Sequence, residues 1–151
     1  MTIAALNDER RHRRVDYRYL LAIPTRWMDN DTYGHVNNVT YYSYFDTVVN
    51  EHLVRVGGLD IHQASAIGLV VETSCRFHRP LSFPETIDAA LRVAKIGNSS
   101  VNYEIALFRR EEEFPAATGR FVHVWVERAA QRPISVPDHI RAALEPLMVA
   151  T

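Results

Sequence analysis

The sequence is poor in cysteine, since Cys75 is the only one among 151 residues. One cysteine cannot form a disulfide within the chain, which excludes the small secreted folds that are held together by cross-links. Unpaired cysteines are typical of proteins from reducing compartments. We therefore expect a cytoplasmic location and a fold that depends on its hydrophobic core alone.

An excess of charge of either sign is also missing. The chain has 17 Lys and Arg against 18 Asp and Glu, a formal net charge of -1. Such a balance gives no general attraction to nucleic acid or to an anionic membrane, so we expect no nucleic-acid partner. The arginine-rich residues 10–14 leave one alternative, phosphate contact by the leader. Weak, salt-dependent binding that is lost when residues 1–14 are deleted would identify it.

No apolar run is long enough to cross a membrane. The apolar residues Ile3 to Leu6 are too few, and the charges follow them, the reverse of a secretory signal. We expect no membrane insertion. Internal repeats, low-complexity segments and long linkers are also missing. The sequence therefore predicts a poorly ordered leader over 1–14 and a single domain over 15–151.

Several catalytic signatures are absent as well. The sequence has no His/Cys cluster with metal-ligand spacing, no glycine-rich phosphate loop and no G-x-S-x-G element of a serine hydrolase. We expect neither a metal nor an organic cofactor. The chemistry must then come from ordinary side chains and the backbone.

Hydrophobic residues make up 47% of the chain, enough for a sizeable core. Apolar residues at helical spacing from Val39 to Val56 predict one long helix, capped by Asn37 or Asn38 and ended by Gly57 and Gly58. Alternating apolar and polar residues predict strands. These strands cover residues 17–23, 67–77, 87–93, 101–107 and 119–127, and a short helix follows over 137–146.

The predicted order is one strand, a long helix and four further strands, an α+β fold. Short connections between consecutive strands predict an antiparallel meander. The strands are about as long as the helix, so one curved sheet could wrap around it. The outer face and the edges of such a sheet need cover, which predicts a homodimer or a homotetramer.

The region of greatest interest is residues 26–46, R-W-M-D-N-D-T-Y-G-H-V-N-N-V-T-Y-Y-S-Y-F-D. Its D-x-D-x-x-G-H-V-N-N core and following Y-x-x-Y-F-D resemble the 4-hydroxybenzoyl-CoA thioesterase family of hotdog-fold acyl-CoA thioesterases. The resemblance implies a five-stranded antiparallel sheet wrapped around one long central helix. It also implies hydrolysis of acyl-CoA or acyl-carrier-protein thioesters to a free acid and a thiol.

The residue types suit this chemistry. A carboxylate can attack a thioester carbonyl as a nucleophile or act as a base toward water, and the sequence leaves both open. Free N–H groups at a helix start can polarise the carbonyl oxygen. An acidic loop that leads directly into a helix supplies both parts within a few residues.

The resemblance assigns roles to individual positions. Asp31 takes the catalytic position, and Asp29 is expected to orient the loop. The backbone N–H of Asn38 is expected to face the thioester oxygen; some relatives carry a histidine there and this chain does not. His35 is therefore a further catalytic candidate and Asn37 a substrate-binding one. As alternatives, the aspartates could be turn formers and the asparagines only helix caps.

Further candidates lie outside the motif. Tyr41 could line an acyl channel, and Arg76 and Arg79 could meet the phosphates of coenzyme A. Asp46 is expected to be a buried structural partner, and Glu72 to lie at a surface or an interface. Two other functions stay open, a non-catalytic acyl-thioester binding protein and another hotdog enzyme such as a dehydratase.

Overall fold

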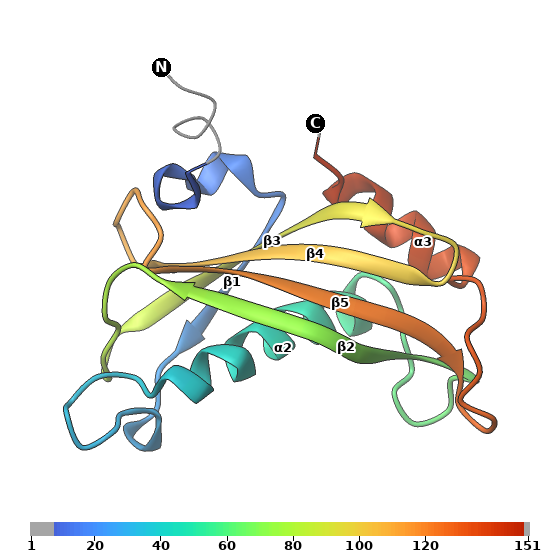
Figure 1. Cartoon of the computed structure of the whole chain (residues 1–151), viewed down its shortest axis with the longest axis horizontal. Coiled ribbons are helices and arrows are strands. Elements are labelled where there is room, and N and C mark those ends of the chain that lie inside the picture. Colours follow the sequence, from blue (N-terminus) through green and yellow to red (C-terminus); the bar gives the residue numbers. More distant parts are fainter. Residues whose placement is uncertain (1–7, 150–151) are drawn as a thin grey trace.

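The computed structural model describes residues 8–149. One antiparallel sheet and one long helix dominate it (Figure 1), which confirms the predicted α+β class. The helices are α2 (Asn38–Arg55) and α3 (Asp138–Leu144), and the strands are β1 (Tyr19–Pro24), β2 (Ala66–Phe77), β3 (Thr86–Ile96), β4 (Ser100–Arg109) and β5 (Ala117–Glu127). Short 3-10 turns are η1 (Glu9–Arg11), η2 (Arg14–Asp16), η3 (Trp27–Asp29) and η4 (Glu145–Leu147).

Helix α2 follows the predicted period. The side chain of Asn37 accepts a hydrogen bond from the N–H of Val39 at 3.0 Å and caps the helix. The helix ends before Gly58, whose φ of +67° is a backbone conformation that glycine adopts without strain. Its apolar face is buried in the core and consists of Tyr41, Tyr44, Phe45, Val48, Val49 and Leu53.

The strand order is β1-β3-β4-β5-β2, and every pair is antiparallel. The predicted meander is therefore correct for β3 to β5 and wrong for β2, which pairs with β5 rather than β3. Strand β1 occupies the edge of β3 that β2 would need. The segment 78–85 instead carries the chain past three strand spacings, about 14 Å, which eight residues reach easily.

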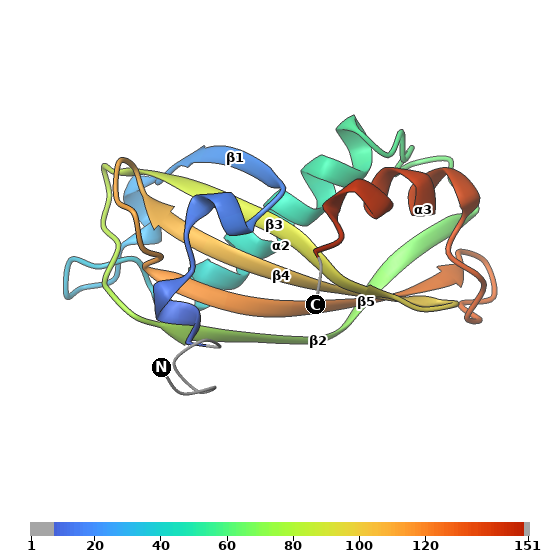
Figure 2. The ribbon, with the colours of Figure 1, turned by 90° about the horizontal axis from the view of Figure 1, so that it is seen from above.

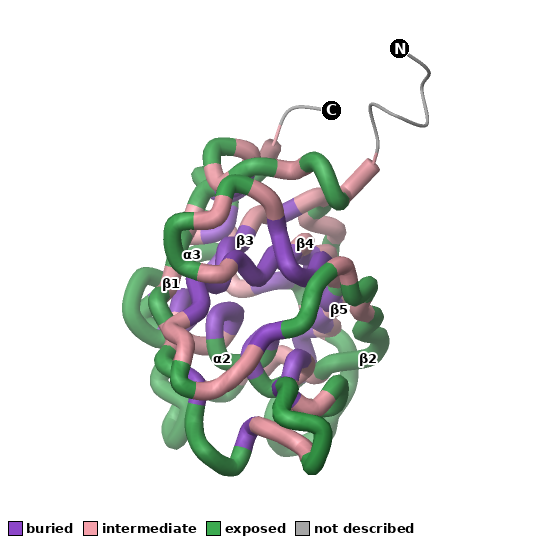
Figure 3. Tube along the Cα trace, turned by 90° about the vertical axis from the view of Figure 1, so that its left-hand side faces the viewer, coloured by how far each residue is buried: buried purple, intermediate pink, exposed green. Residues whose placement is uncertain are grey.

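Alternate residues of the sheet face α2, and Leu91, Tyr103, Ile105, Phe121 and Trp125 are buried there. Seen end-on, α2 lies between the edge strands β1 and β2 and beneath the middle strands (Figure 3). Helix α3 adds buried apolar side chains to the same core; Figure 2 shows it from above.

The described part of the leader lies on the opposite side of the sheet from α2 (Figure 1). Tyr17, expected to begin the first strand, instead follows η2 and packs edge-on against Phe108 on this outer face. Residues 1–7 of the expected leader lie outside the described residues. Residues 8–14 contain η1 and the start of η2, and their order in solution stays a prediction.

Candidate active site

The loop between β1 and α2 carries most of the candidate residues. It folds back on itself, because the N–H of Asp31 donates to the carbonyl of His35 at 2.8 Å and the N–H of Gly34 donates to the carbonyl of Asp31 at 3.1 Å. Gly34 has a φ of +85°, which makes this tight turn possible without side-chain strain. A bridge between Asn30 and Val36 closes the loop.

Asp29 is buried and fixes the loop to α2. Its side chain is 1% exposed and accepts hydrogen bonds from the hydroxyl of Tyr44 at 2.8 Å and the backbone N–H of Arg26 at 2.8 Å. Burial alone would raise the pKa of Asp29, but these bonds and the Arg26 guanidinium outweigh it, so the pKa lies below its usual value. These contacts agree with the orienting role that the sequence predicts.

Asp31 has a different environment at the open side of the loop. One carboxylate oxygen accepts a hydrogen bond from the N–H of Tyr33 at 2.8 Å. The other oxygen, Oδ2, has no hydrogen-bond partner among residues 8–149. One bond therefore fixes the side chain, and the second oxygen is left available to a ligand or a water molecule.

The N-cap of α2 lies at the same hollow as this carboxylate. Asn37 and Asp31 line the same hollow, and Asn37 itself is held by its N–H bond to the carbonyl of Asp29 at 2.8 Å. Among the first N–H groups of the helix, that of Val39 bonds to the Asn37 side chain and that of Thr40 to the Asn37 carbonyl. The N–H of Asn38 makes no such bond within the described chain.

The crossing segment 78–85 supports the loop from outside. The carbonyl of Leu81 accepts from the N–H of Val36 at 2.7 Å, and the hydroxyl of Ser82 donates to the carbonyl of Gly34 at 3.0 Å. The N–H of Phe83 also donates to the side-chain oxygen of Asn30 at 2.9 Å, and these two residues are 53 apart in the chain, which is why sequence reasoning missed this support. Its signal was the pair Pro80 and Pro84, which interrupts the strand pattern.

The hollow beside Asp31 is open and has a volume of about 990 Å³. Its wall contains three exposed apolar side chains, Trp27, Met28 and Tyr33, and Tyr33 is 87% exposed. Sequence reasoning missed these residues as well, although they are part of the motif region. Apolar side chains so exposed around a carboxylate form a surface that an acyl chain or a partner could cover.

A second, smaller hollow of about 320 Å³ adjoins the loop. His35, Tyr41 and Arg79 line it together with Phe77, whose ring stacks edge-on to Tyr41 with 4.9 Å between the centroids. Of the predicted site residues, Asp31 and Asn37 therefore share one hollow, and His35, Tyr41 and Arg79 share the next.

The remaining candidates lie elsewhere. Arg76 is on the outer face of the sheet, where its Nη1 lies 3.8 Å from a carboxylate oxygen of Glu9. Asp46 is exposed on α2 and accepts a hydrogen bond from Asn50 at 3.0 Å. The expectation that Asp46 is buried is therefore wrong for the single chain. Glu72 is exposed on β2.

Within residues 8–149, no group of three or more His, Cys, Asp or Glu side chains is placed to hold a metal ion. None of the helices in that range combines the length and the apolar character needed to cross a membrane.

A family model described as the thioesterase-like superfamily matches residues 25–144, which include the loop, α2 and the whole sheet after β1. The PA5185 protein of Pseudomonas aeruginosa is 53% identical to this chain, with a TM-score of 0.89 over 90% of this chain and 95% of that one. The PA2801 protein of the same organism, described as a candidate thioesterase, is 32% identical, with a TM-score of 0.79 over 84% and 98%.

A thioesterase of Thermus thermophilus, solved in complex with coenzyme A and zinc, is 25% identical to this chain. Its TM-score is 0.73, and the match covers 87% of this chain and 95% of that one. The family match over residues 25–144 contains the residues that line both hollows.

Proposed function

The chain belongs to the thioesterase-like superfamily, and from this premise we propose that it hydrolyses acyl thioesters with Asp31 as the catalytic carboxylate. One observation carries the proposal. Asp31, with its free oxygen, and Asn37, the N-cap of α2, line the same hollow, and the N–H of the next residue, Asn38, is unused within the described chain.

Each group has a chemical task in this proposal. As a base, the Oδ2 of Asp31 takes a proton from water, and the water oxygen attacks the carbonyl carbon. The carbonyl oxygen gains negative charge and accepts a hydrogen bond from the Asn38 N–H. The intermediate then expels the thiolate, which takes the proton from Asp31. His35 is a further candidate for proton transfer from the neighbouring hollow.

A nucleophilic role for Asp31 is the other route. Its carboxylate would attack the carbonyl, release the thiolate and leave an anhydride, which water then hydrolyses. Single turnover in ¹⁸O-labelled water detects this anhydride when water attacks its Asp31 carbon. Label in the Asp31 carboxyl, found by mass spectrometry, then marks the nucleophilic route, because the base route places label in the acid product alone.

The substrate is proposed as an acyl group on coenzyme A or on an acyl carrier protein. The coenzyme A bound to the Thermus thermophilus thioesterase supports the first carrier. Trp27, Met28 and Tyr33 beside Asp31 would contact the acyl group, and Asn37 and Tyr41 would contact the thioester and its arm. We further propose the hotdog fold with α2 as its central helix, the 4-hydroxybenzoyl-CoA thioesterase branch, a homodimer or homotetramer, and a cytoplasmic location.

Asp31→Asn tests the proposal directly. Turnover should fall by roughly 10²–10⁴-fold, because the amide cannot accept the proton or attack the carbonyl. Thiol release from acyl-CoAs of graded chain length measures it, and circular dichroism checks the fold. Asp138→Asn, an exposed aspartate at the start of α3, is the matched control and should keep wild-type turnover.

Near wild-type turnover by a folded Asp31→Asn protein would contradict the assignment. A wild-type protein that binds acyl thioesters without releasing thiol would instead be a binding protein. The outcome that we expect is a folded, inactive variant that still binds its substrate.

A further inference from the structure

A third hollow lies where the leader meets the turn between β4 and β5. Four arginines and one aromatic ring line this space of about 360 Å³: Arg10, Arg11, Arg13, Arg79 and Phe114. We call it the leader pocket. Four guanidinium groups around one small hollow favour a ligand with several negative charges.

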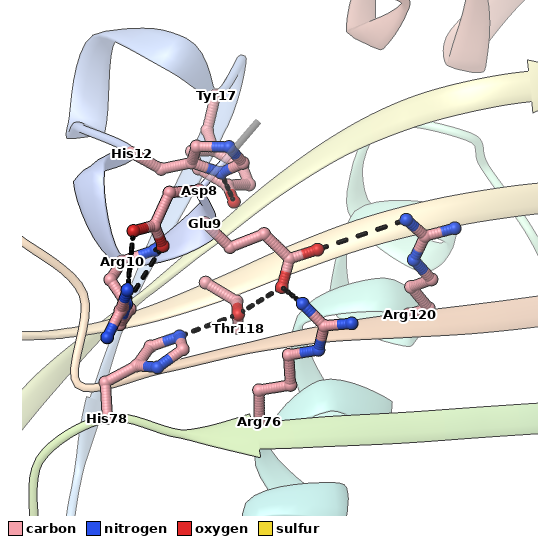
Figure 4. Close-up of polar contacts among 9 residues, drawn as sticks. All are labelled: Asp8, Glu9, Arg10, His12, Tyr17, Arg76, His78, Thr118 and Arg120. Carbon is pink, nitrogen blue, oxygen red and sulfur yellow. Dashed lines mark hydrogen bonds and ion pairs between the residues drawn. The ribbon is translucent and has the colours of Figure 1, made fainter. Parts of the chain in front are cut away.

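A half-buried carboxylate attaches the leader to the sheet (Figure 4). Glu9, 15% exposed, accepts a hydrogen bond from the hydroxyl of Thr118 at 2.7 Å. Its carboxylate also lies 3.8 Å from Arg76 and 4.0 Å from Arg120. The single hydroxyl proton of Thr118 goes to Glu9, so the Nε2 of His78, at 2.9 Å, donates to Thr118.

A second attachment holds the same stretch of chain. The guanidinium of Arg14 donates to Asp88 at 2.6 Å and to the carbonyl of Arg109 at 2.9 Å. Glu9 and Arg14 lie on either side of residues 10–13 in the sequence. The arginines between them are therefore fixed beside Arg79 rather than free along an extended chain.

The pocket keeps an excess of positive charge. Three of its arginines have an acidic neighbour, in the pairs Arg10–Asp8, Arg13–Glu113 and Arg79–Glu112. Arg11 has no ion pair within residues 8–149, so four guanidinium groups face three carboxylates. The paired side chains remain open to water, up to 70% exposed for Arg10. Such surface pairs are weak and can rearrange around a phosphate.

Arg79 connects the leader pocket to the candidate active site. It lines this pocket and also the hollow that contains His35 and Tyr41. His35 belongs to the Asp31 loop, so Arg79 links the leader pocket to a hollow that adjoins this loop. A long, flexible ligand with a reactive group at one end and phosphates at the other matches this arrangement.

We propose that the leader pocket binds the phosphorylated nucleotide end of coenzyme A, and that it selects coenzyme A over carrier-protein thioesters. This inference rests on the proposed thioester hydrolysis and deepens it. The arginines bind the phosphates, and the Phe114 ring, 5.9 Å from the Arg13 guanidinium carbon, offers a face for the adenine. Three of the four arginines come from the leader, outside residues 25–144 that match the family.

The test compares one acyl group on four thiols: coenzyme A, 3′-dephospho-coenzyme A, an acyl carrier protein and N-acetylcysteamine. Replacement of Arg10, Arg11 and Arg13 by Gln should raise KM for the coenzyme A thioester about tenfold or more, since several charge-assisted bonds are lost. It should leave kcat unchanged and spare the N-acetylcysteamine thioester. Arg11→Gln alone should act in the same direction, and Arg55→Gln, at an exposed arginine of α2 that does not line the pocket, should not.

A binding measurement separates this inference from the hydrolysis proposal. Adenosine 3′,5′-bisphosphate should bind to the wild type in calorimetry, bind much more weakly to the triple variant, and compete better than inorganic phosphate. Such binding supports the pocket even if no thioester is hydrolysed. Hydrolysis with an unchanged KM in the triple variant overturns the inference, and so does equal competition by inorganic phosphate. A triple variant that loses only carrier-protein turnover overturns the choice of coenzyme A.

Discussion

At the scale of single residues, the two aspartates of the loop have opposite surroundings although one residue separates them. Asp29 is enclosed by Tyr44 and Arg26, whereas Asp31 has one backbone bond and a free oxygen. Carboxylates in the first environment stabilise a fold, and carboxylates in the second are available for reaction. The two roles can therefore be separated by equivalent substitutions.

Asp29→Asn should destabilise the protein by about 1–3 kcal/mol at neutral pH, because the new amide N–H₂ would face the donors of Arg26. Urea denaturation measures this loss. The Asp29 pKa lies below its unfolded value, so its contribution is present above that value and is lost as the pH falls through the folded pKa. The difference between variant and wild type should therefore shrink in acid. Equal stability at pH 7 would contradict the structural role.

His123 is the second residue whose surroundings predict a pH-dependent change in stability. It is buried among aromatic rings of β4 and β5, its Nδ1 has no hydrogen-bond partner in the described chain, and burial lowers its pKa to about 4. The unfolded chain takes up a proton near pH 6.5 and the folded chain does not, so stability should fall as the pH drops between these values.

In the His123→Phe variant, an aromatic ring that cannot take up a proton replaces the histidine. This variant should lack that pH dependence, which amounts to about 2 kcal/mol between pH 7.5 and pH 5 for one such histidine. Urea unfolding at the two pH values measures it for both proteins. The same pH dependence in the variant would show that His123 is not its source.

At the scale of elements, the approach of α2 to the sheet depends on Gly119 of β5. A Cβ built at this position would lie 2.6 Å from the carbonyl oxygen of Ser74 and would overlap the ring of Phe45. Both neighbours are fixed, one by strand pairing and the other by complete burial. The helix can lie this close only because the strand has no side chain there.

Gly119→Ala should therefore destabilise the protein by about 1–3 kcal/mol through overpacking and shift α2 away from β5. Thermal unfolding would measure the loss. Phe45→Leu in the same chain should recover part of it, because the ring that the new methyl group meets is gone. An alanine variant as stable as the wild type would contradict the close packing of Gly119 against Phe45 and Ser74.

The element boundaries could largely be predicted from the sequence, and the pairing could not. Alternation and helical spacing depend on neighbouring residues, so α2 and the strands were found within a few positions. The place of β2 depends on an edge of β5 that is formed some 40 residues later in the chain. The candidate site follows the same rule. Asp31 and Asn38 belong to one short motif and were proposed from it, whereas Leu81 and Ser82 lie more than 40 residues away and their support of the loop was missed.

At the scale of the whole molecule, the exposed edge strand β2 predicts assembly. Val70, Val71 and Phe77 are exposed along it, and Val71 is 59% exposed. Unpaired backbone groups beside apolar side chains favour pairing with another strand. A second copy of this chain offers the same edge, so a two-fold contact would cover both.

Wild-type protein should therefore run as a dimer of the 17.3 kDa chain or as a larger assembly in light scattering at micromolar concentration. Val71→Lys should shift it toward monomer, because a charge would be buried at the contact. Leu20→Lys on the other edge strand, β1, is the matched control and should keep the assembly. A wild-type protein that is only monomeric would count decisively against this prediction.

The crossing segment 78–85 also determines when the site can form. It holds the Asp31 loop and follows β2, whose one partner in the described sheet is β5. Contacts between such distant parts of a chain form slowly during folding. A nascent chain that ends before β5 therefore contains every residue of the motif without the support for its loop. Catalytic competence should then appear late in refolding, together with the burial of Trp125 in β5.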